Sequence, residues 1–336
     1  MILHPGALSL IIGSLIVIMM MVYSSMLGLK ILKRWDVDNS SSEQLSLERK
    51  TYLLSTIMNY TLGFVILSAF LFIYTADDIH RIFIGAMCAT GSLNANPIGW
   101  YVLYTKIIVF FLSSIWIVFN YIDQKAEDYP LVRTKYTMLL SITPFIILDT
   151  YFQAKYFLGI KPNIITSCCG SLFSEGGKGI ASSLSSLPVK PMMIIFYVTI
   201  GIFLLTSFLS LRSQKSILKY ALTILSLVVF VVSIASIISF ISLYFYEIPT
   251  HHCPFDIIQK DYHFVGYPVY ITLFSGVFFG MITGIFEPFR KISSLNIIIE
   301  NSQKRWIVLS ILLISIFTII CSCPILFSNF TLKGYY

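Results

Sequence analysis

The chain alternates between long apolar segments and short polar connections, and the apolar segments determine its fold class. A bilayer core about 30 Å thick is crossed by about 20 helical residues, and only α-helices and closed barrels satisfy every backbone polar group inside it. A barrel would require shorter segments in which apolar and polar positions alternate, and the sequence lacks that pattern. We therefore predict an all-α, polytopic transmembrane helix bundle that forms a single transmembrane domain over residues 1–336. The predicted helices are 6–29, 51–76, 99–122, 136–158, 191–211, 220–246, 264–286 and 306–328.

The fourth of these eight helices has the weakest apolar pattern, because Pro144, Asp149 and Lys155 interrupt it. Without it the chain would have seven spans, and every later connection would lie on the opposite side of the membrane. Eight helices are preferred because they separate the basic residues of the connections more completely.

The connections differ in charge, and this difference predicts the orientation of the bundle. Of the 23 Lys and Arg residues, 15 follow the first, third, fifth and seventh predicted helices. Short basic connections lie in the cytoplasm, so both the N-terminus and the C-terminus are expected on the outer, periplasmic or extracellular side. The first helix is long enough to remain as a signal-anchor. An uncleaved helical protein of this kind is typical of the bacterial cytoplasmic (inner) membrane.

The composition supports a membrane protein and changes the meaning of the net charge. Hydrophobic residues make up 57% of the chain and charged residues 12%, whereas an average soluble domain has roughly 25% charged residues. The net charge of +7 is divided among short clusters instead of lying along one soluble face, so it indicates topology. We expect no nucleic-acid partner. The expected partners are the lipid bilayer and other protein subunits on the outer face.

All six cysteines and all five histidines fall on or near the predicted outer side. Thiolates and imidazoles select soft metal ions such as copper or zinc. The spacing contains no diagnostic metal motif, and an even number of cysteines in an oxidising compartment is also the usual sign of disulfides. Six cysteines allow 15 pairings, and the sequence does not choose among them. The predicted metal-binding residues are His251, His252, Cys253, Cys168, Cys169 and Cys88.

The segment 249–267 contains more reactive side chains than any other outer connection. It includes three histidines, one cysteine and two aspartates. Pro254 restricts the backbone beside Cys253 and gives that thiol a defined direction. If the outer face carries a functional site, we therefore expect His252 and Cys253 to belong to it.

Two charged residues lie inside the predicted spans, Lys106 in the third and Asp149 in the fourth. Charges at membrane depth are usually paired or functional, so we predict an intramembrane ion pair that lines a cavity open to the outside. The alternative for Lys106 is that its side chain extends to the membrane interface. No histidine lies at membrane depth, which argues against an intramembrane bis-histidine haem. A quinone site near the outer surface, or a partner protein that carries the cofactors, remains compatible with the sequence.

Three functions are consistent with these observations, and no motif assigns a reaction, an enzyme activity or catalytic residues. The first is an integral membrane subunit of a redox or electron-transfer assembly, with the outer Cys/His cluster as a metal, thiol-redox or partner-docking site. The second is a permease for a soft metal or small solute. It would need a polar path through the bundle, and the predicted spans supply little of one. The third is a structural or assembly protein with disulfide-stapled outer loops.

Overall fold

The structure, a computed structural model, describes residues 4–35, 41–161, 165–166 and 184–332. Two compact units are present, and each is described by itself. Unit 1 consists of residues 1–83, 92–164 and 292–298, and unit 2 of residues 84–91, 165–291 and 299–336.

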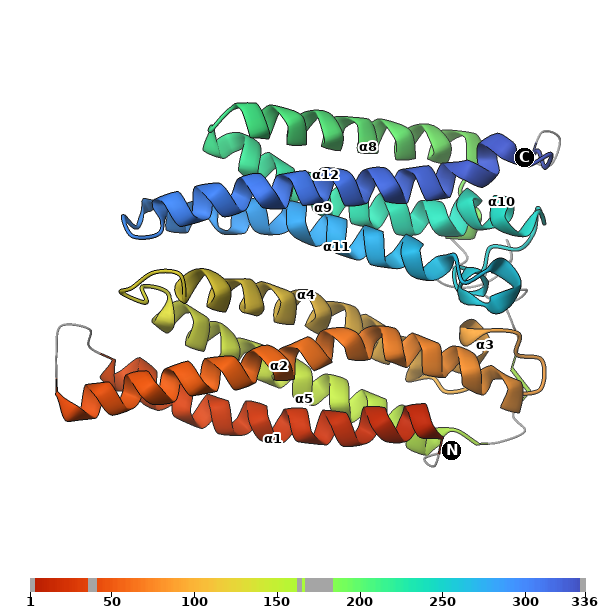
Figure 1. The fold of residues 1–336 in the computed structure, drawn as a ribbon. Coiled ribbons are helices and arrows are strands. Elements are labelled where there is room, and N and C mark those ends of the chain that lie inside the picture. Colours follow the sequence, from red (N-terminus) through yellow and green to blue (C-terminus); the bar gives the residue numbers. More distant parts are fainter. Residues whose placement is uncertain (1–3, 36–40, 162–164, 167–183, 333–336) are drawn as a thin grey trace. The chain divides into compact units, whose positions relative to one another are not determined.

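Unit 1 is a bundle of four long helices (Figure 1). Each helix packs on two neighbours, because α1 and α4 both contact α2 and both contact α5. Met21, Met58, Trp116 and Leu139 belong to its buried core. The helices of unit 1 are α1 (Pro5–Arg34), α2 (Ser42–Asp78), α4 (Gly99–Asp123) and α5 (Val132–Gly159), with the short helix η1 (Ile79–Ile82) after α2.

Unit 2 also contains four long helices, and α9 packs against both α8 and α11. The α9 helix continues through a π-helical segment into α10. Phe196 packs edge-on against Phe240 and Phe317 in the apolar interior. Its elements are α8 (Val189–Arg212), α9 (Ser216–Ser236), η2 (Ile237–Ile241), α10 (Ser242–Tyr246), η3 (Asp256–Ile258), η4 (Lys260–Tyr262), α11 (Gly266–Ile285), η5 (Glu287–Lys291) and α12 (Asn296–Phe327), while the short helix α3 (Ala89–Asn94) straddles the two units.

Seven helical segments in the described part of the chain are long and apolar enough to cross a membrane. The eighth long helix, α5, has 28 residues and contains Pro144. Its polar residues Asp149 and Gln153 are buried, and Gln153 donates hydrogen bonds to Ser14 Oγ at 2.9 Å and to the Leu10 carbonyl at 3.1 Å. The weak hydropathy of this segment therefore reflects polar contacts inside the bundle. The prediction of an all-α, multi-pass membrane protein is confirmed.

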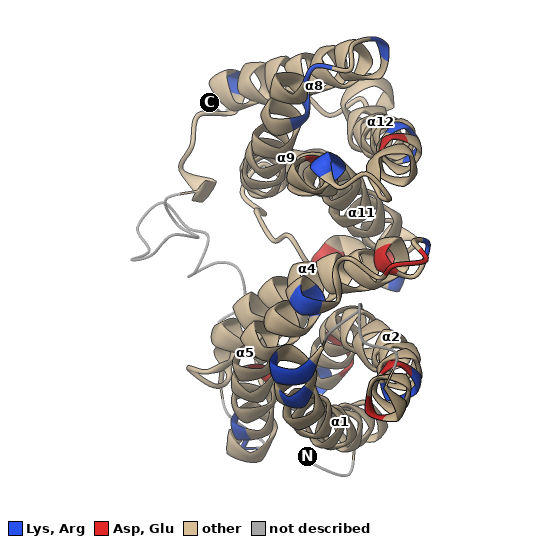
Figure 2. Cartoon of the chain, turned by 90° about the vertical axis from the view of Figure 1, so that its left-hand side faces the viewer, with Lys and Arg blue, Asp and Glu red and all other residues tan. Residues whose placement is uncertain are grey.

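Several helices are longer than their apolar segments. α2 begins at Ser42 and α12 at Asn296, nine and ten residues earlier than the predicted starts at 51 and 306. Ser41 caps α2 by accepting a hydrogen bond from the Gln44 N–H at 3.3 Å. A hydropathy pattern detects only the apolar part of a helix, so it did not predict these polar N-terminal extensions. In Figure 2, many of the Lys and Arg residues of each unit lie on the helix ends nearest the viewer.

Candidate functional site

The connection between α10 and α11 is held in place by tyrosine hydroxyls. Tyr246, the last residue of α10, donates a hydrogen bond to the Cys253 carbonyl at 2.5 Å and accepts one from the Ile257 N–H at 3.0 Å. Tyr270 of α11 donates to the Pro254 carbonyl at 2.5 Å. These bonds fix the backbone on both sides of Cys253, whose side chain is fully buried.

A second cysteine reaches this position from a distant part of the sequence. Cys88 lies in the 84–91 segment of unit 2, and its Sγ is 3.4 Å from Cys253 Sγ across a separation of 165 residues. Thr90 Oγ1 is 3.3 Å from Cys253 Sγ. Gln259 Nε2 donates to the Met87 carbonyl at 2.7 Å and joins the two segments beside the sulfurs.

Asp256 completes the cluster. Its Oδ1 accepts a hydrogen bond from the Cys253 thiol at 3.3 Å, and its Oδ2 contacts His251 Nε2. The Phe255 N–H donates to Cys253 Sγ at 3.4 Å. Burial, together with the nearby carboxylate of Asp256, raises the pKa of Tyr262.

The donor atoms of this cluster are close enough together to hold a metal ion. One ligand atom each from Cys88, Cys253 and Asp256 lies within 4.8 Å of the others, and all three residues are buried. A tetrahedral ion with metal–sulfur bonds of about 2.3 Å would hold two sulfurs roughly 3.8 Å apart, whereas a disulfide requires about 2.05 Å. The observed 3.4 Å is too long for a disulfide and is the distance of a hydrogen bond between two thiols.

Comparison of the chain with protein-family models, with curated proteins and with solved structures gave no match.

The two predicted histidines differ in their contacts. Nδ1 of His252 donates to the Ile238 carbonyl at 2.9 Å, inside the π-helical segment of α9. In this π-helical segment the Ser242 N–H donates its hydrogen bond to the Ile237 carbonyl. In an α-helix the same N–H would donate to the Ile238 carbonyl. His252 therefore anchors the loop to the helix, and His251 is the histidine that contacts the cluster through Asp256. Two predicted residues, Cys168 and Cys169, lie outside the described residues.

Asp256 and Thr90 were absent from the predicted site. A signal for Asp256 was present, because it lies three residues after Cys253 in a short loop. Nothing in the sequence indicated that the segment around Thr90 would meet that loop. The last two cysteines lie in α12, with Cys321 buried and Cys323 exposed.

Lys106 and Asp149 are in direct contact inside unit 1. Lys106 Nζ is 2.7 Å from Asp149 Oδ2, and their side chains are 2% and 5% exposed. Thr105 Oγ1 donates to Asp149 Oδ1 at 3.1 Å, and Lys106 also donates to Ser68 Oγ at 3.2 Å. Lys106 therefore does not extend to the interface. Its predicted role in lining an open cavity stays a prediction.

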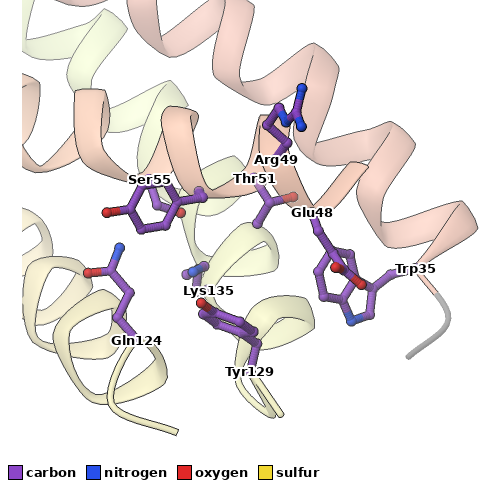
Figure 3. Close-up of a pocket in the computed structure, with 9 residues that line it drawn as sticks. Trp35, Glu48, Arg49, Thr51, Ser55, Gln124, Tyr129 and Lys135 are labelled. Atoms are coloured by element: carbon purple, nitrogen blue, oxygen red, sulfur yellow. The ribbon is translucent and has the colours of Figure 1, made fainter. Parts of the chain in front are cut away.

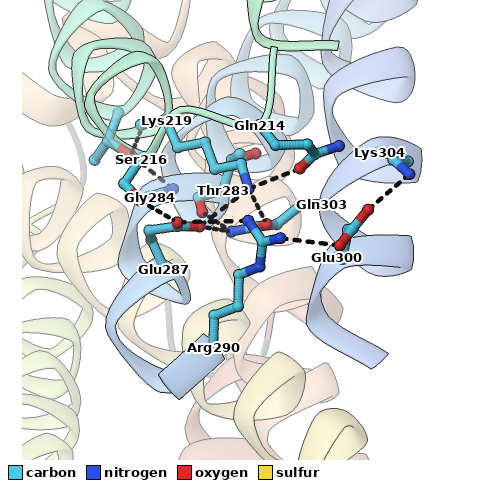
Figure 4. A network of polar contacts seen from close by, with 11 residues as sticks. Gln214, Ser216, Lys219, Thr283, Gly284, Glu287, Arg290, Glu300, Gln303 and Lys304 are labelled. Carbon is cyan, nitrogen blue, oxygen red and sulfur yellow. Dashed lines mark hydrogen bonds and ion pairs between the residues drawn. The ribbon is translucent and has the colours of Figure 1, made fainter. Parts of the chain in front are cut away.

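Two further buried ion pairs involve lysines that the charge pattern placed in cytoplasmic connections. Lys135 Nζ is 2.7 Å from Asp123 Oδ2, with exposures of 1% and 0%. Lys219 Nζ is 3.2 Å from Glu287 Oε2, in the network that Figure 4 shows. Gln303 of α12 donates to Glu287 Oε2 at 2.8 Å and accepts from Lys219 at 2.8 Å. Both lysines therefore lie inside helices and hold their bundle together, instead of facing water.

Proposed function

We propose that the protein is an integral membrane subunit of a redox or electron-transfer assembly and that Cys88, Cys253 and Asp256 bind a soft metal ion. The observation that carries the proposal is the convergence of two thiols and a carboxylate, all buried, within 4.8 Å. Residues from distant segments meet there, so the cluster is a product of the fold.

The electrostatics of the cluster favour a bound cation. Two thiolates and a carboxylate would place three negative charges in a buried volume, which is strongly unfavourable without a counter-ion. Copper and zinc both accept thiolate ligands, and zinc also accepts carboxylate oxygen. His251 would orient Asp256 by a hydrogen bond to Oδ2, the carboxylate oxygen that does not bind the metal. Such a hydrogen bond to the second oxygen of a ligating carboxylate is common.

The charge pattern supports an outer location for this centre. Within unit 2, the α10–α11 connection lies at the opposite end of the helices from the basic α8–α9 and α11–α12 connections (Figure 1), so the positive-inside rule favours a location outside the cytoplasm. The bacterial inner membrane, with both chain termini outside, fits this arrangement. Partner subunits would then meet the protein on its outer face.

A dithiol–disulfide centre is the second candidate, because the two sulfurs are already in contact at 3.4 Å. In that reaction the Cys88 and Cys253 thiols would lose two protons and two electrons and form one S–S bond. A disulfide of a partner molecule would gain both and become two thiols. Asp256 would accept the proton of the Cys253 thiol and pass it to a thiolate released from the partner disulfide.

Metal analysis of the purified protein separates these functions. The protein is prepared in detergent without oxygen, and bound copper and zinc are quantified by mass spectrometry together with its free thiols. We expect about one ion per chain, lost in Cys88→Ser and Cys253→Ser and weakened in Asp256→Asn. The matched control is Cys323→Ser, which removes an exposed cysteine of α12 and should retain the ion.

The metal found also decides the role of the site. Copper supports electron transfer, whereas zinc has no redox chemistry and would favour a structural role. A metal-free protein with a Cys88–Cys253 disulfide would replace the metal centre by the dithiol centre. Retention of the ion in Cys253→Ser would overturn the metal centre.

A further inference from the structure

A cavity of about 380 Å³ lies at one end of unit 2, where the start of α8 meets the residues that follow α12. Figure 1 shows the start of α8, the α10 helix and the C-terminal end of α12 at this same end of the unit. The volume lies within the range of ligand pockets, which begins at about 300 Å³. The cavity therefore has room for a small ligand or for the headgroup of a lipid.

The residues that follow α12 form one wall of this cavity. The Ser328 N–H donates to the Pro324 carbonyl at 3.0 Å, and Ser328 Oγ accepts a hydrogen bond from the Phe330 N–H at 3.0 Å. Phe330 packs edge-on against the ring of Tyr244 of α10, with 5.7 Å between the ring centres. Leu332 is buried. These contacts make the wall a defined part of the fold.

Lys190 is the charged side chain among the described residues that line the cavity, and it is exposed. Its ammonium group forms no ion pair or hydrogen bond with another residue that the structure describes. The first turn of α8, to which Lys190 belongs, contains no acidic residue. A ligand in the cavity can therefore reach an ammonium group whose charge is not balanced by a neighbouring carboxylate of its own helix.

The other polar groups of the cavity are compatible with an anion. No acidic residue is among the described residues that line it. Glu247 contacts the lining through Ser328, whose hydroxyl donates to Glu247 Oε1 at 2.6 Å. Asn329 lines the cavity and is exposed, and its side-chain amide has two N–H donors. A phosphate group beside Lys190 and Asn329 would receive hydrogen bonds from both.

The apolar part of the lining indicates what carries the phosphate. Met193 of α8 and Ile325 of α12 line the cavity, and their neighbours in sequence, Ile194 and Leu326, are 65% and 73% exposed. Both helices are long and apolar enough to cross a membrane, so these exposed side chains suit acyl chains. Inorganic phosphate would use none of this apolar surface. A phospholipid would use both the apolar surface and the ammonium group.

A cavity of about 270 Å³ in unit 1, which Figure 3 shows, differs in its charges. Its lysine, Lys135, is 1% exposed and lies 2.7 Å from Asp123. The lining also includes an acidic residue, Glu48. An anion is therefore better accommodated in the unit 2 cavity, where the lysine is exposed and no acidic side chain is among the described lining residues.

We propose that the unit 2 cavity binds the headgroup of an anionic phospholipid. The phosphate accepts hydrogen bonds from Lys190 and Asn329, and the acyl chains lie against the exposed apolar side chains of α8 and α12. The bound lipid joins the start of α8 to the residues that follow α12. The proposal does not depend on the metal centre, because no residue of this cavity is among the proposed metal ligands.

Lipid binding is measured by native mass spectrometry of the full-length protein, released from detergent after titration with phosphatidylglycerol or phosphatidylcholine. We expect phosphatidylglycerol to bind more tightly. Lys190→Gln should weaken its binding about tenfold, the effect of losing one hydrogen bond from a charged donor. Lys190→Arg keeps the charge and should retain most of the binding. The matched control is Lys260→Gln, which removes an exposed lysine of η4 in the same unit and should bind as the parent protein does.

Phe330→Ala distinguishes a formed cavity from general attraction between charges. This variant leaves the net charge unchanged and removes the ring from the cavity wall, so phosphatidylglycerol binding should weaken. Binding equal to that of the parent in Phe330→Ala would overturn the proposal, as would equal binding in Lys190→Gln and Lys260→Gln. Equal affinity for the two lipids would overturn it as well. Displacement of phosphatidylglycerol by inorganic phosphate at the same concentration would show a site for free phosphate and would overturn the assignment to a lipid.

Discussion

The buried pair of Lys106 and Asp149 permits a sharp test of what holds unit 1 together. In Lys106→Met, the Asp149 carboxylate loses its contact at 2.7 Å and keeps the hydroxyl of Thr105 at 3.1 Å. Removing one member of a buried pair costs about 3–5 kcal/mol, because the other charge is left uncompensated. Both side chains are at most 5% exposed, so water does not screen this loss. Typical stabilities are about 5–15 kcal/mol, and a large share of the total would be removed.

The double variant Lys106→Met/Asp149→Leu removes both charges and keeps similar side-chain volumes, so it separates the effect of charge from the effect of packing. Replacing both charges by apolar side chains of similar size is often neutral, or stabilising by about 1–4 kcal/mol. We therefore expect the double variant to recover most of the stability that Lys106→Met loses. The matched control is Lys155→Met, an exposed lysine of α5, which should unfold as the parent does.

Thermal and urea unfolding in detergent, followed by circular dichroism and by monodispersity, provides the measurement. The variants form a double-mutant cycle with Asp149→Leu as the fourth protein. Two results would refute the reasoning: a Lys106→Met protein as stable as the Lys155→Met control, or a double variant whose loss equals the sum of the two single losses.

Three further predictions concern unit 2 and the topology. Gly280→Ala should destabilise the protein by about 1–3 kcal/mol in thermal unfolding, because its new Cβ would lie 2.3 Å from a serine hydroxyl of α9; Gly201→Ala meets nothing within 4 Å and should be neutral or stabilising. In cysteine-free protein, Lys260→Cys should react with a membrane-impermeant maleimide in intact cells and Lys304→Cys only after lysis, and the reverse pattern would invert the orientation. Glu287→Gln should cost about 3–5 kcal/mol in urea unfolding, since it leaves the buried lysine of α9 uncompensated; an unchanged midpoint would contradict this role.

The sequence predicted the helices well because lipid imposes a simple rule on them. A segment that crosses a bilayer must be apolar over about 20 residues, and seven of the eight predicted helices show this property in the structure. This rule did not predict the polar extension of α12 or the exact start of α2, because hydrogen bonding and capping determine where a helix begins. The α5 helix was the weakest prediction for a related reason: Asp149 and Gln153 lower its hydropathy and yet are buried against neighbouring helices.

Long-range convergence could not be predicted from the sequence. Cys88 and Cys253 are separated by 165 residues, and many cysteine pairings were equally compatible with the sequence. The role of Asp256 depends on a 3.3 Å contact with one of these sulfurs. His252 was expected at the site, but it donates to a carbonyl of the π-helical segment, a local irregularity that hydropathy does not reveal.

The sequence by itself determined the class of protein, the helical spans and the clustering of basic residues in alternate connections, because each follows from local composition and the thickness of a membrane. The tertiary structure alone decided which charges are paired and which sulfurs meet. Contacts of this kind depend on how helices pack, and packing joins residues that are distant in the chain. The chemistry of the protein lies in those contacts.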